Sequence, residues 1–197
     1  QPIAFPHDLH AGKNEIDCQY CHSASRKSKT AGIPSVNVCM NCHKGVQEGQ
    51  RSGKEEIAKI YKAAGWDVDK RMYNHGTTDE PVWENQPRTD TPIEWVKVHN
   101  LADFVYFNHS QHVEVGKIEC QTCHGPVEQM DQAEQWAPLT MKWCIECHRE
   151  TEVNFEGNEY YDRIHEEARE AYKHLPIDEF KLTVEKIGGL ECGKCHY

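Results

Sequence analysis

The chain has 197 residues, of which 38% are hydrophobic and 9% aromatic, and its formal net charge is −10 at pH 7. This charge argues against nucleic acid and anionic lipid as partners, because both repel an acidic surface. No stretch approaches about 18 consecutive apolar residues, so no membrane span is expected within this sequence. Because the sequence starts with Gln1 and not Met, we expect a preceding piece, either a signal peptide or a membrane anchor.

The first predicted feature is a pair of histidines three residues apart. Phe5, His7 and His10 form the pattern F-x-H-x-x-H. On a short helix such a pair projects from one face on successive turns, so it can serve two neighbouring metal centres. A lone His is more often surface or core filler, but this pattern is found again later in the chain, which favours metal ligation.

The pattern C-x-x-C-H follows and occurs five times. It contains all the cysteines, namely Cys18, Cys21, Cys39, Cys42, Cys120, Cys123, Cys144, Cys147, Cys192 and Cys195, and the histidines His22, His43, His124, His148 and His196. C-x-x-C-H is the attachment pattern of c-type haem. The two thiols lie on one side of a helical turn, where both can bond the vinyl groups along one edge of the macrocycle. The His then lies under the ring centre and ligates the iron from the proximal side.

Three other uses of paired cysteines fit less well. Zinc knuckles use two pairs for each metal, which leaves one of five pairs unmatched and does not explain the His. A thioredoxin-like redox pair expects a βαβ context that this sequence lacks. Disulfides between adjacent cysteines occur in secreted proteins, but they also leave the repeated His unexplained. The sequence therefore predicts five covalently bound haem c groups.

Residues 1–50 form a first predicted dihaem module, and residues 51–104 connect it to the next. Ser52-Gly-Lys-Glu55 has the pattern of a capping box, and the apolar stripe Ile57, Ile60, Tyr61 and Ala64 then predicts a helix that packs through this face. The segment 66–94 is rich in Asp, Asn, Pro and Thr, and we expect an extended loop that covers haem edges. Its tryptophans and Trp95 are interpreted as cover and not electron relays, and His75 as a surface residue.

Residues 105–150 are predicted to repeat the first module. Phe107, His109, His112, Ile118 and Cys120 match the earlier pattern with a constant displacement of 102 residues, which indicates a duplicated unit. Each copy continues to a second C-x-x-C-H motif. The chain is thus two dihaem halves followed by a C-terminal segment, residues 151–197, with the fifth motif.

The C-terminal segment contains a second predicted helix, from about Glu159 to Leu175, ended by Pro176. His165 shares its apolar face and is a possible ligand, whereas His174 is expected to be solvated. The acidic face of this helix is interpreted as solvated and not as a docking surface.

The predicted fold follows from the ratio of chain to cofactor. Five haems leave about 39 residues each, too few for five protein cores, and small domains short of apolar side chains need cofactors or crosslinks. We expect a mainly α protein with a haem-stacked core, low secondary-structure content and much irregular chain.

The module F-x-H-x-x-H followed by C-x-x-C-H resembles the class III, c7-like multihaem cytochromes. The resemblance implies that the first His ligates the haem of its own motif and the second ligates the next haem. His7 would then serve the haem at Cys18, and His10 the haem at Cys39. In the second module, His109 would serve the haem at Cys120, and His112 the haem at Cys144.

The resemblance also bears on the fifth iron. In c7-like cytochromes the corresponding ligand comes from just before the preceding motif, where Met141 stands three residues before Cys144. His99 is a near-equal candidate and His165 a poorer one.

Two further stretches carry a more specific resemblance, Trp95-Val-Lys-Val-His99 through His109 and Pro138-Leu-Thr-Met141 through Arg149. They are similar to the pentahaem cytochrome subunit of bacterial alternative complex III. This implies relay of electrons from a quinol-oxidising membrane complex toward a cytochrome c or terminal oxidase. The implied partners are iron–sulfur and membrane subunits and a mono-haem cytochrome c subunit or oxidase, with no nucleic acid. Attachment to the periplasmic side of the inner membrane would come through a preceding N-terminal segment or through the partners.

Two other functions remain open at the level of sequence. A soluble c7-like electron shuttle differs from the complex subunit in its partners only. A multihaem reductase of nitrite or hydroxylamine needs one iron with an open site, and the His and Met residues suffice to fill every site. We therefore expect no independent catalytic site.

Overall fold

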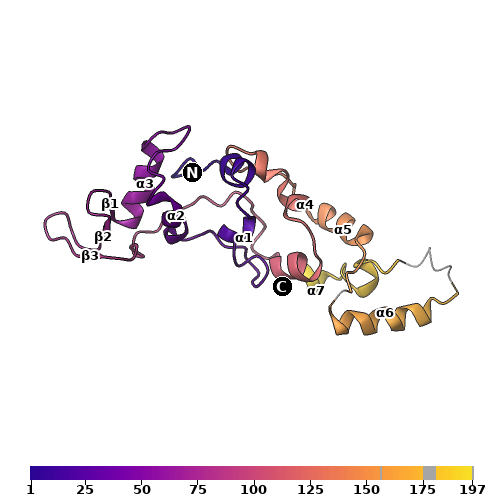
Figure 1. The fold of residues 1–197 in the computed structure, drawn as a ribbon. Helices are drawn as coiled ribbons and strands as arrows, with labels where there is room; N and C mark the ends of the chain where they lie inside the picture. Colours follow the sequence, from indigo (N-terminus) through magenta and orange to yellow (C-terminus); the bar gives the residue numbers. More distant parts are fainter. Residues whose placement is uncertain (156, 175–180, 197) are drawn as a thin grey trace. The chain divides into compact units, whose positions relative to one another are not determined.

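The computed structural model describes residues 1–155, 157–174 and 181–196 (Figure 1). The chain divides into two compact units. Unit 1 comprises residues 1–23, 32–98 and 127–133, and unit 2 comprises residues 24–31, 99–126 and 134–197. Helices are short and long stretches are irregular, so the predicted mainly α fold with low secondary-structure content is confirmed.

Unit 1 contains short helices and one small sheet. In chain order they are the π-helix η1 (Asp8–Lys13), α1 (Cys18–Cys21), α2 (Val36–His43), α3 (Glu55–Ala64), β1 (Trp66–Asp67), β2 (Met72–Asn74), β3 (Trp83–Glu84) and the 3-10 helix η3 (Val127–Gln129). Helices α2 and α3 pack against each other.

The core of unit 1 lies around these two helices. Its buried residues are Ile3, Val36, Met40, Ile57, Ile60, Ala64 and Tyr73. The stripe predicted for the helix after residue 52 is therefore confirmed as a packing face, with Tyr61 partly buried against the same cluster. Because Met40 lies between Cys39 and Cys42 and is fully buried, this core fixes the second C-x-x-C-H motif.

The predicted capping box at Ser52 is wrong. Helix α3 begins at Glu55, and its N-cap is Lys54, which makes no side-chain cap. The Ser52 carbonyl instead accepts the Glu55 N–H, at 3.3 Å, in the turn before the helix. The acidic first turn still suits the helix dipole. The helix ends at Gly65, which has a φ of 73°, the left-handed conformation that glycine adopts without steric cost.

The predicted extended loop at residues 66–94 contains a three-stranded antiparallel sheet, in the order β1-β2-β3. Trp66 pairs with Tyr73 and Asn74 with Trp83. The Trp66 and Tyr73 rings also lie 4.8 Å apart, and such aromatic cross-strand pairs stabilise short sheets. Strands of two or three residues are too short to show an alternating pattern, which is why the sequence indicated a loop.

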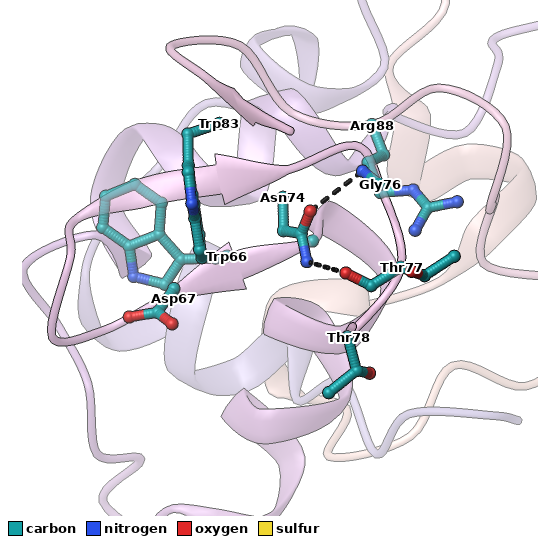
Figure 2. A pocket seen from close by; sticks show the side chains of 9 residues that line it. Trp66, Asp67, Asn74, Gly76, Thr77, Thr78, Trp83 and Arg88 are labelled. Carbon is teal, nitrogen blue, oxygen red and sulfur yellow. Dashed lines mark hydrogen bonds between the residues drawn. The ribbon is translucent and has the colours of Figure 1, made fainter. Parts of the chain in front are cut away.

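A cavity of about 570 Å³ lies beside this sheet (Figure 2). It is lined by Gly65, Trp66, Asp67, Asn74, Gly76, Thr77, Thr78, Trp83 and Arg88. The Asn74 side chain shapes its rim, since it accepts the Gly76 N–H at 2.9 Å and donates to the Thr77 carbonyl at 3.0 Å. No Cys or His lines the cavity, so it lies outside the candidate haem sites. His75 is exposed and its Nε2 lies 2.8 Å from the Gln86 carbonyl.

Unit 2 is mostly helical. Its elements are the π-helix η2 (Gln111–Val115), α4 (Cys120–His124), α5 (Met141–Glu150), α6 (Glu159–Ala171), the 3-10 helix η4 (Glu185–Ile187) and α7 (Cys192–Cys195). Its buried apolar side chains among the described residues are Ala137, Val153 and Leu182.

Helix α6 is shorter than predicted. It begins after Asn158, whose side chain accepts the Tyr160 N–H at 3.2 Å, and it ends at Ala171. The predicted end at Leu175 is therefore too late, while Leu175 and Pro176 themselves lie outside the described residues. Across the described ranges, none of the helices has the length and apolar character needed to cross a bilayer.

Candidate haem-binding sites

The two histidine pairs lie on turns with the same unusual backbone. Both turns are π-helical, with the Asn14 N–H bonded to the Leu9 carbonyl and the Gly116 N–H bonded to the Gln111 carbonyl, each at 3.0 Å. The second residue after each turn has a left-handed φ, 52° at Glu15 and 53° at Lys117. Such conformations are costly for residues other than glycine, and π-helical turns are frequent at functional sites.

One phenylalanine packs against both histidines of each pair. The Phe5 ring lies edge-on to His7 at 4.9 Å and stacks on His10 at 4.3 Å. The corresponding distances from Phe107 are 5.0 Å to His109 and 4.4 Å to His112. The F-x-H-x-x-H pattern thus gives one local structure twice.

Three of the paired histidines face a C-x-x-C-H histidine. The ring centroids of His10 and His43 lie 6.3 Å apart, as do those of His109 and His124. Those of His112 and His148 lie 6.1 Å apart. A metal–imidazole nitrogen bond is about 2.0 Å long and the centroid lies about 1.1 Å further on, so two imidazoles on opposite sides of one metal ion have centroids about 6.2 Å apart. The residues therefore fit axial ligation of an iron between them.

His7 is the fourth member of the two pairs. Burial lowers its pKa, and the charges of His22 and His10 lower the pKa further, which shows that His22 lies nearby. Its Nδ1 is buried without a hydrogen-bond partner. A ring in this environment is neutral, the form in which imidazole binds a metal.

Backbone carbonyls orient most of these rings. The Nδ1 atoms lie 2.7 to 2.9 Å from a carbonyl oxygen in six cases: His10 with Pro6, His22 with Gly32, His43 with Val46, His109 with Lys29, His112 with Asn108 and His148 with Gly189. An Nδ1–H that donates to a carbonyl leaves the Nε2 lone pair for a metal ion and fixes the ring. Sequence analysis missed these acceptors, because a main-chain carbonyl has no residue-type pattern.

The two cysteines of each motif lie within one helical turn, and their exposure differs from motif to motif. Helices α1, α4 and α7 consist almost entirely of their C-x-x-C-H motifs. Burial, followed by the charges of Cys147, Cys144 and Cys120, raises the pKa of the Cys123 thiol to about 11. Burial also raises the pKa of Cys21, Cys39 and Cys144. No disulfide links the cysteines, all of which lie in the described ranges.

The fifth motif has different neighbours. His196 directly follows α7 and forms an antiparallel β-bridge with Val105, and its ring lies 5.6 Å from that of Phe104. The Tyr106 N–H also donates to the Cys195 carbonyl at 2.8 Å. An irregular segment near the second His pair therefore holds this motif in place.

The structure also locates the three candidates for the fifth distal ligand. Met141 is the first residue of α5 and is 67% exposed. His99 lies beside His124, with Nε2 3.2 Å from Nδ1 of that residue, and its pKa is lowered by burial and by the charge of His109. The His165 ring lies 4.3 Å from Phe155. Each remains a predicted ligand of the fifth iron.

Within the ranges described, no three His, Cys, Asp or Glu side chains converge as a metal-ion cluster requires. What converges instead is pairs of histidines, the set of ligands that a haem iron takes above and below its ring.

Comparison with known proteins agrees with this geometry. Residues 84–197 match the class III cytochrome C family, and residues 3–59 match cytochrome c7 and related cytochrome c. The chain belongs to the class III cytochrome c family, and it is a multihaem c-type cytochrome that transfers electrons through covalently bound haem c.

The chain is also similar to one individual protein. The multiheme cytochrome c subunit of a menaquinone reductase from Nitratidesulfovibrio vulgaris is 24% identical over 167 residues. The similarity covers 75% of this chain and 67% of that protein.

Proposed function

We propose that this chain binds five haem c groups and relays electrons within a quinone-linked respiratory membrane complex. The observation that carries the proposal is the spacing of 6.1 to 6.3 Å between three facing histidine pairs. When bound, haem c supplies a one-electron iron couple whose potential depends on its axial ligands and surroundings.

The histidines of the C-x-x-C-H motifs hold the irons from one side. On the other side, His7 serves the haem of His22 and His10 that of His43. In the second module, His109 serves the haem of His124, and His112 that of His148. Backbone carbonyls hold six of these eight rings in place, so that little rearrangement accompanies a change of charge at the metal.

The fifth haem is attached through Cys192 and Cys195, with His196 as proximal ligand. We keep Met141 as its distal ligand on the resemblance to c7-like cytochromes. With this assignment every iron has two protein ligands, and the chain has no open iron for a small substrate. A nitrite or hydroxylamine reductase would need such a site.

The membrane complex is proposed from two similarities. The relative in Nitratidesulfovibrio vulgaris is a subunit of a menaquinone reductase, and the stretches around His99 and Met141 resemble the pentahaem subunit of alternative complex III. Both indicate a quinone partner, but the first name implies electron flow to quinone and the second flow from quinol. We propose the second direction, toward a cytochrome c or oxidase on the periplasmic side, with iron–sulfur and membrane subunits as partners.

A soluble electron shuttle is the second candidate function. The match of residues 3–59 to cytochrome c7 and related cytochrome c favours it. The shuttle and the complex subunit use the same haems and differ in their partners, so only the partners can distinguish them.

The test is purification of a tagged full-length chain from its own cells under mild detergent. We expect five haems per chain by intact mass and pyridine haemochrome assay, and co-purification with iron–sulfur and membrane subunits. Reduction of the haems by added quinol would support the proposed direction, whereas oxidation of prereduced haems by quinone alone would reverse it. A chain that purifies alone with five haems would favour the shuttle, and bound zinc would overturn both proposals.

A further inference from the structure

His124 differs from the other oriented histidines in the group that its Nδ1 faces. Six rings direct Nδ1 to a backbone carbonyl, as described above. The Nδ1 of His124 lies instead 3.2 Å from Nε2 of the His99 side chain. The two rings meet edge to face, with centroids 4.4 Å apart and planes at 77°.

Iron ligation would fix the direction of this hydrogen bond. If Nε2 of His124 binds iron, Nδ1 carries the proton and must be the donor. His99 is then the acceptor through Nε2 and carries its own proton on Nδ1. Because the Nε2 lone pair of His99 accepts this hydrogen bond, it is not available to bind a second metal ion.

We propose that His99 is a positioning residue for the haem of His124 and lowers the reduction potential of that haem. This inference rests on the proposed haem ligation by His124. An imidazole nitrogen is a much stronger base than an amide carbonyl, so it draws the Nδ1 proton more strongly. The His124 ring then donates more electron density to the iron, which stabilises the oxidised form.

His109 is the other proposed ligand of this haem, and its Nδ1 faces a backbone carbonyl. The Nδ1 of His109 lies 2.8 Å from the Lys29 carbonyl. The corresponding haem of the first module provides an internal comparison, because Nδ1 of His22 lies 2.7 Å from the Gly32 carbonyl. Of these two haems, the haem of His124 therefore has the more basic partner on its proximal ligand.

The experiment compares the intact holoprotein with three variants, each of which carries one substitution. His99→Leu removes the acceptor, His99→Gln replaces it with a weaker amide acceptor, and His75→Leu changes an exposed His outside the haem sites as a control. Spectroelectrochemical titration gives the potentials, low-temperature electron paramagnetic resonance gives the spin state, and intact mass gives the haem count.

We expect all His99 variants to keep their full haem count and low-spin iron. In His99→Leu the reduction potential of one haem should rise by about 59 mV, which for one electron is a tenfold fall in the ratio of oxidised to reduced iron at a given applied potential. A tenfold change is at the lower end of the range for loss of an outer-shell partner, which typically costs tenfold to hundredfold in metal affinity or activity. In His99→Gln the same potential should move part of the way, and in His75→Leu none should move.

Two results would overturn the proposal. Appearance of one high-spin iron in His99→Gln would show that His99 is a metal ligand, as in its predicted role at the fifth haem. Unchanged potentials in His99→Gln and His99→Leu would show that the contact has no influence on the haem. Failure of the proposed function would be seen separately, as too few haems in the parent protein.

Discussion

Phe5 and Phe107 each hold two imidazole rings with one side chain. Each ring is edge-on to the first His of its pair and stacked on the second, and the distances in the two copies agree within 0.1 Å. Contact with one shared neighbour thus gives the two imidazole rings the same arrangement in both copies. The pair can therefore serve two irons with a constant geometry between them.

The first prediction concerns Met141, the proposed distal ligand of the fifth iron. Its side chain is 67% exposed at the start of α5, so its replacement should cost little stability. If it ligates the fifth iron, that haem has a higher potential than the bis-His haems. Met141→Leu should then abolish the long-wavelength charge-transfer band of His/Met haem and lower the highest potential of the protein.

Absence of that band from the parent protein would contradict Met141 as a ligand. The control is Met130→Leu, a methionine outside the C-x-x-C-H motifs whose backbone carbonyl, and not its side chain, accepts the Asp8 N–H at 2.9 Å. Its band and potentials should match those of the parent.

How much of the site can be read from the sequence differs from residue to residue. The cysteines and histidines are identifiable because the chemistry requires those residue types at fixed spacing. The carbonyls of Gly32, Lys29 and Gly189 are not, since any residue can supply one. The contact between His99 and His124 was also missed, because it joins side chains that only the folded chain brings together.

At the level of elements, the pattern F-x-H-x-x-H correctly indicates a helical turn, but the sequence gives no sign that the turn is π-helical. The spacing of three residues suits either kind of helix. The capping box at Ser52 was wrong for a related reason, since the same residues can form a turn one step before the helix. Local patterns thus locate these elements better than they fix their hydrogen bonds.

Helix η1 packs unusually closely against η3. A Cβ added at Gly12 would lie 2.2 Å from the Glu128 carbonyl oxygen, closer than real contacts permit. Gly12→Ala should therefore push the two elements apart, at a cost of about 1–3 kcal/mol for an overpacked site. Because η1 carries His10, we expect thermal unfolding of the holoprotein at lower temperature and a fraction of high-spin iron.

The second module provides the matched control. Glu114 stands 102 residues after Gly12, in η2, and makes exposed ion pairs with Arg26 and Lys117. Exposed pairs contribute little, so Glu114→Ala should leave the spin state and unfolding temperature almost unchanged. Equal effects of the two substitutions would contradict the close packing of η1 as the cause.

Across the whole chain, apolar protein core is distributed unevenly. Unit 1 has a seven-residue cluster around α2 and α3, whereas the buried apolar side chains described for unit 2 are three. Phe104 is 60% exposed although its ring lies near His196, and Trp136 is 59% exposed. Large aromatic side chains beside C-x-x-C-H motifs suit contact with the macrocycles. We therefore propose that haem supplies much of the core of unit 2, as the ratio of chain to cofactor predicts.

His112 offers the test of electron relay by the assembled protein. Its ring lies 6.1 Å from His148 and its pKa is lowered first by burial, so it is a neutral proposed ligand of the haem at Cys144. His112→Leu should leave one iron per chain with an open site, able to bind carbon monoxide when reduced. Because a relay depends on every intermediate centre, electron flow from quinol to acceptor in the purified complex should fall severalfold, while quinol binding to the partner subunits stays unchanged.

His174→Leu, at an exposed position after α6, should have neither effect. Rapid carbon monoxide or nitrite binding to the reduced parent protein would instead reveal a native open iron and support a reductase.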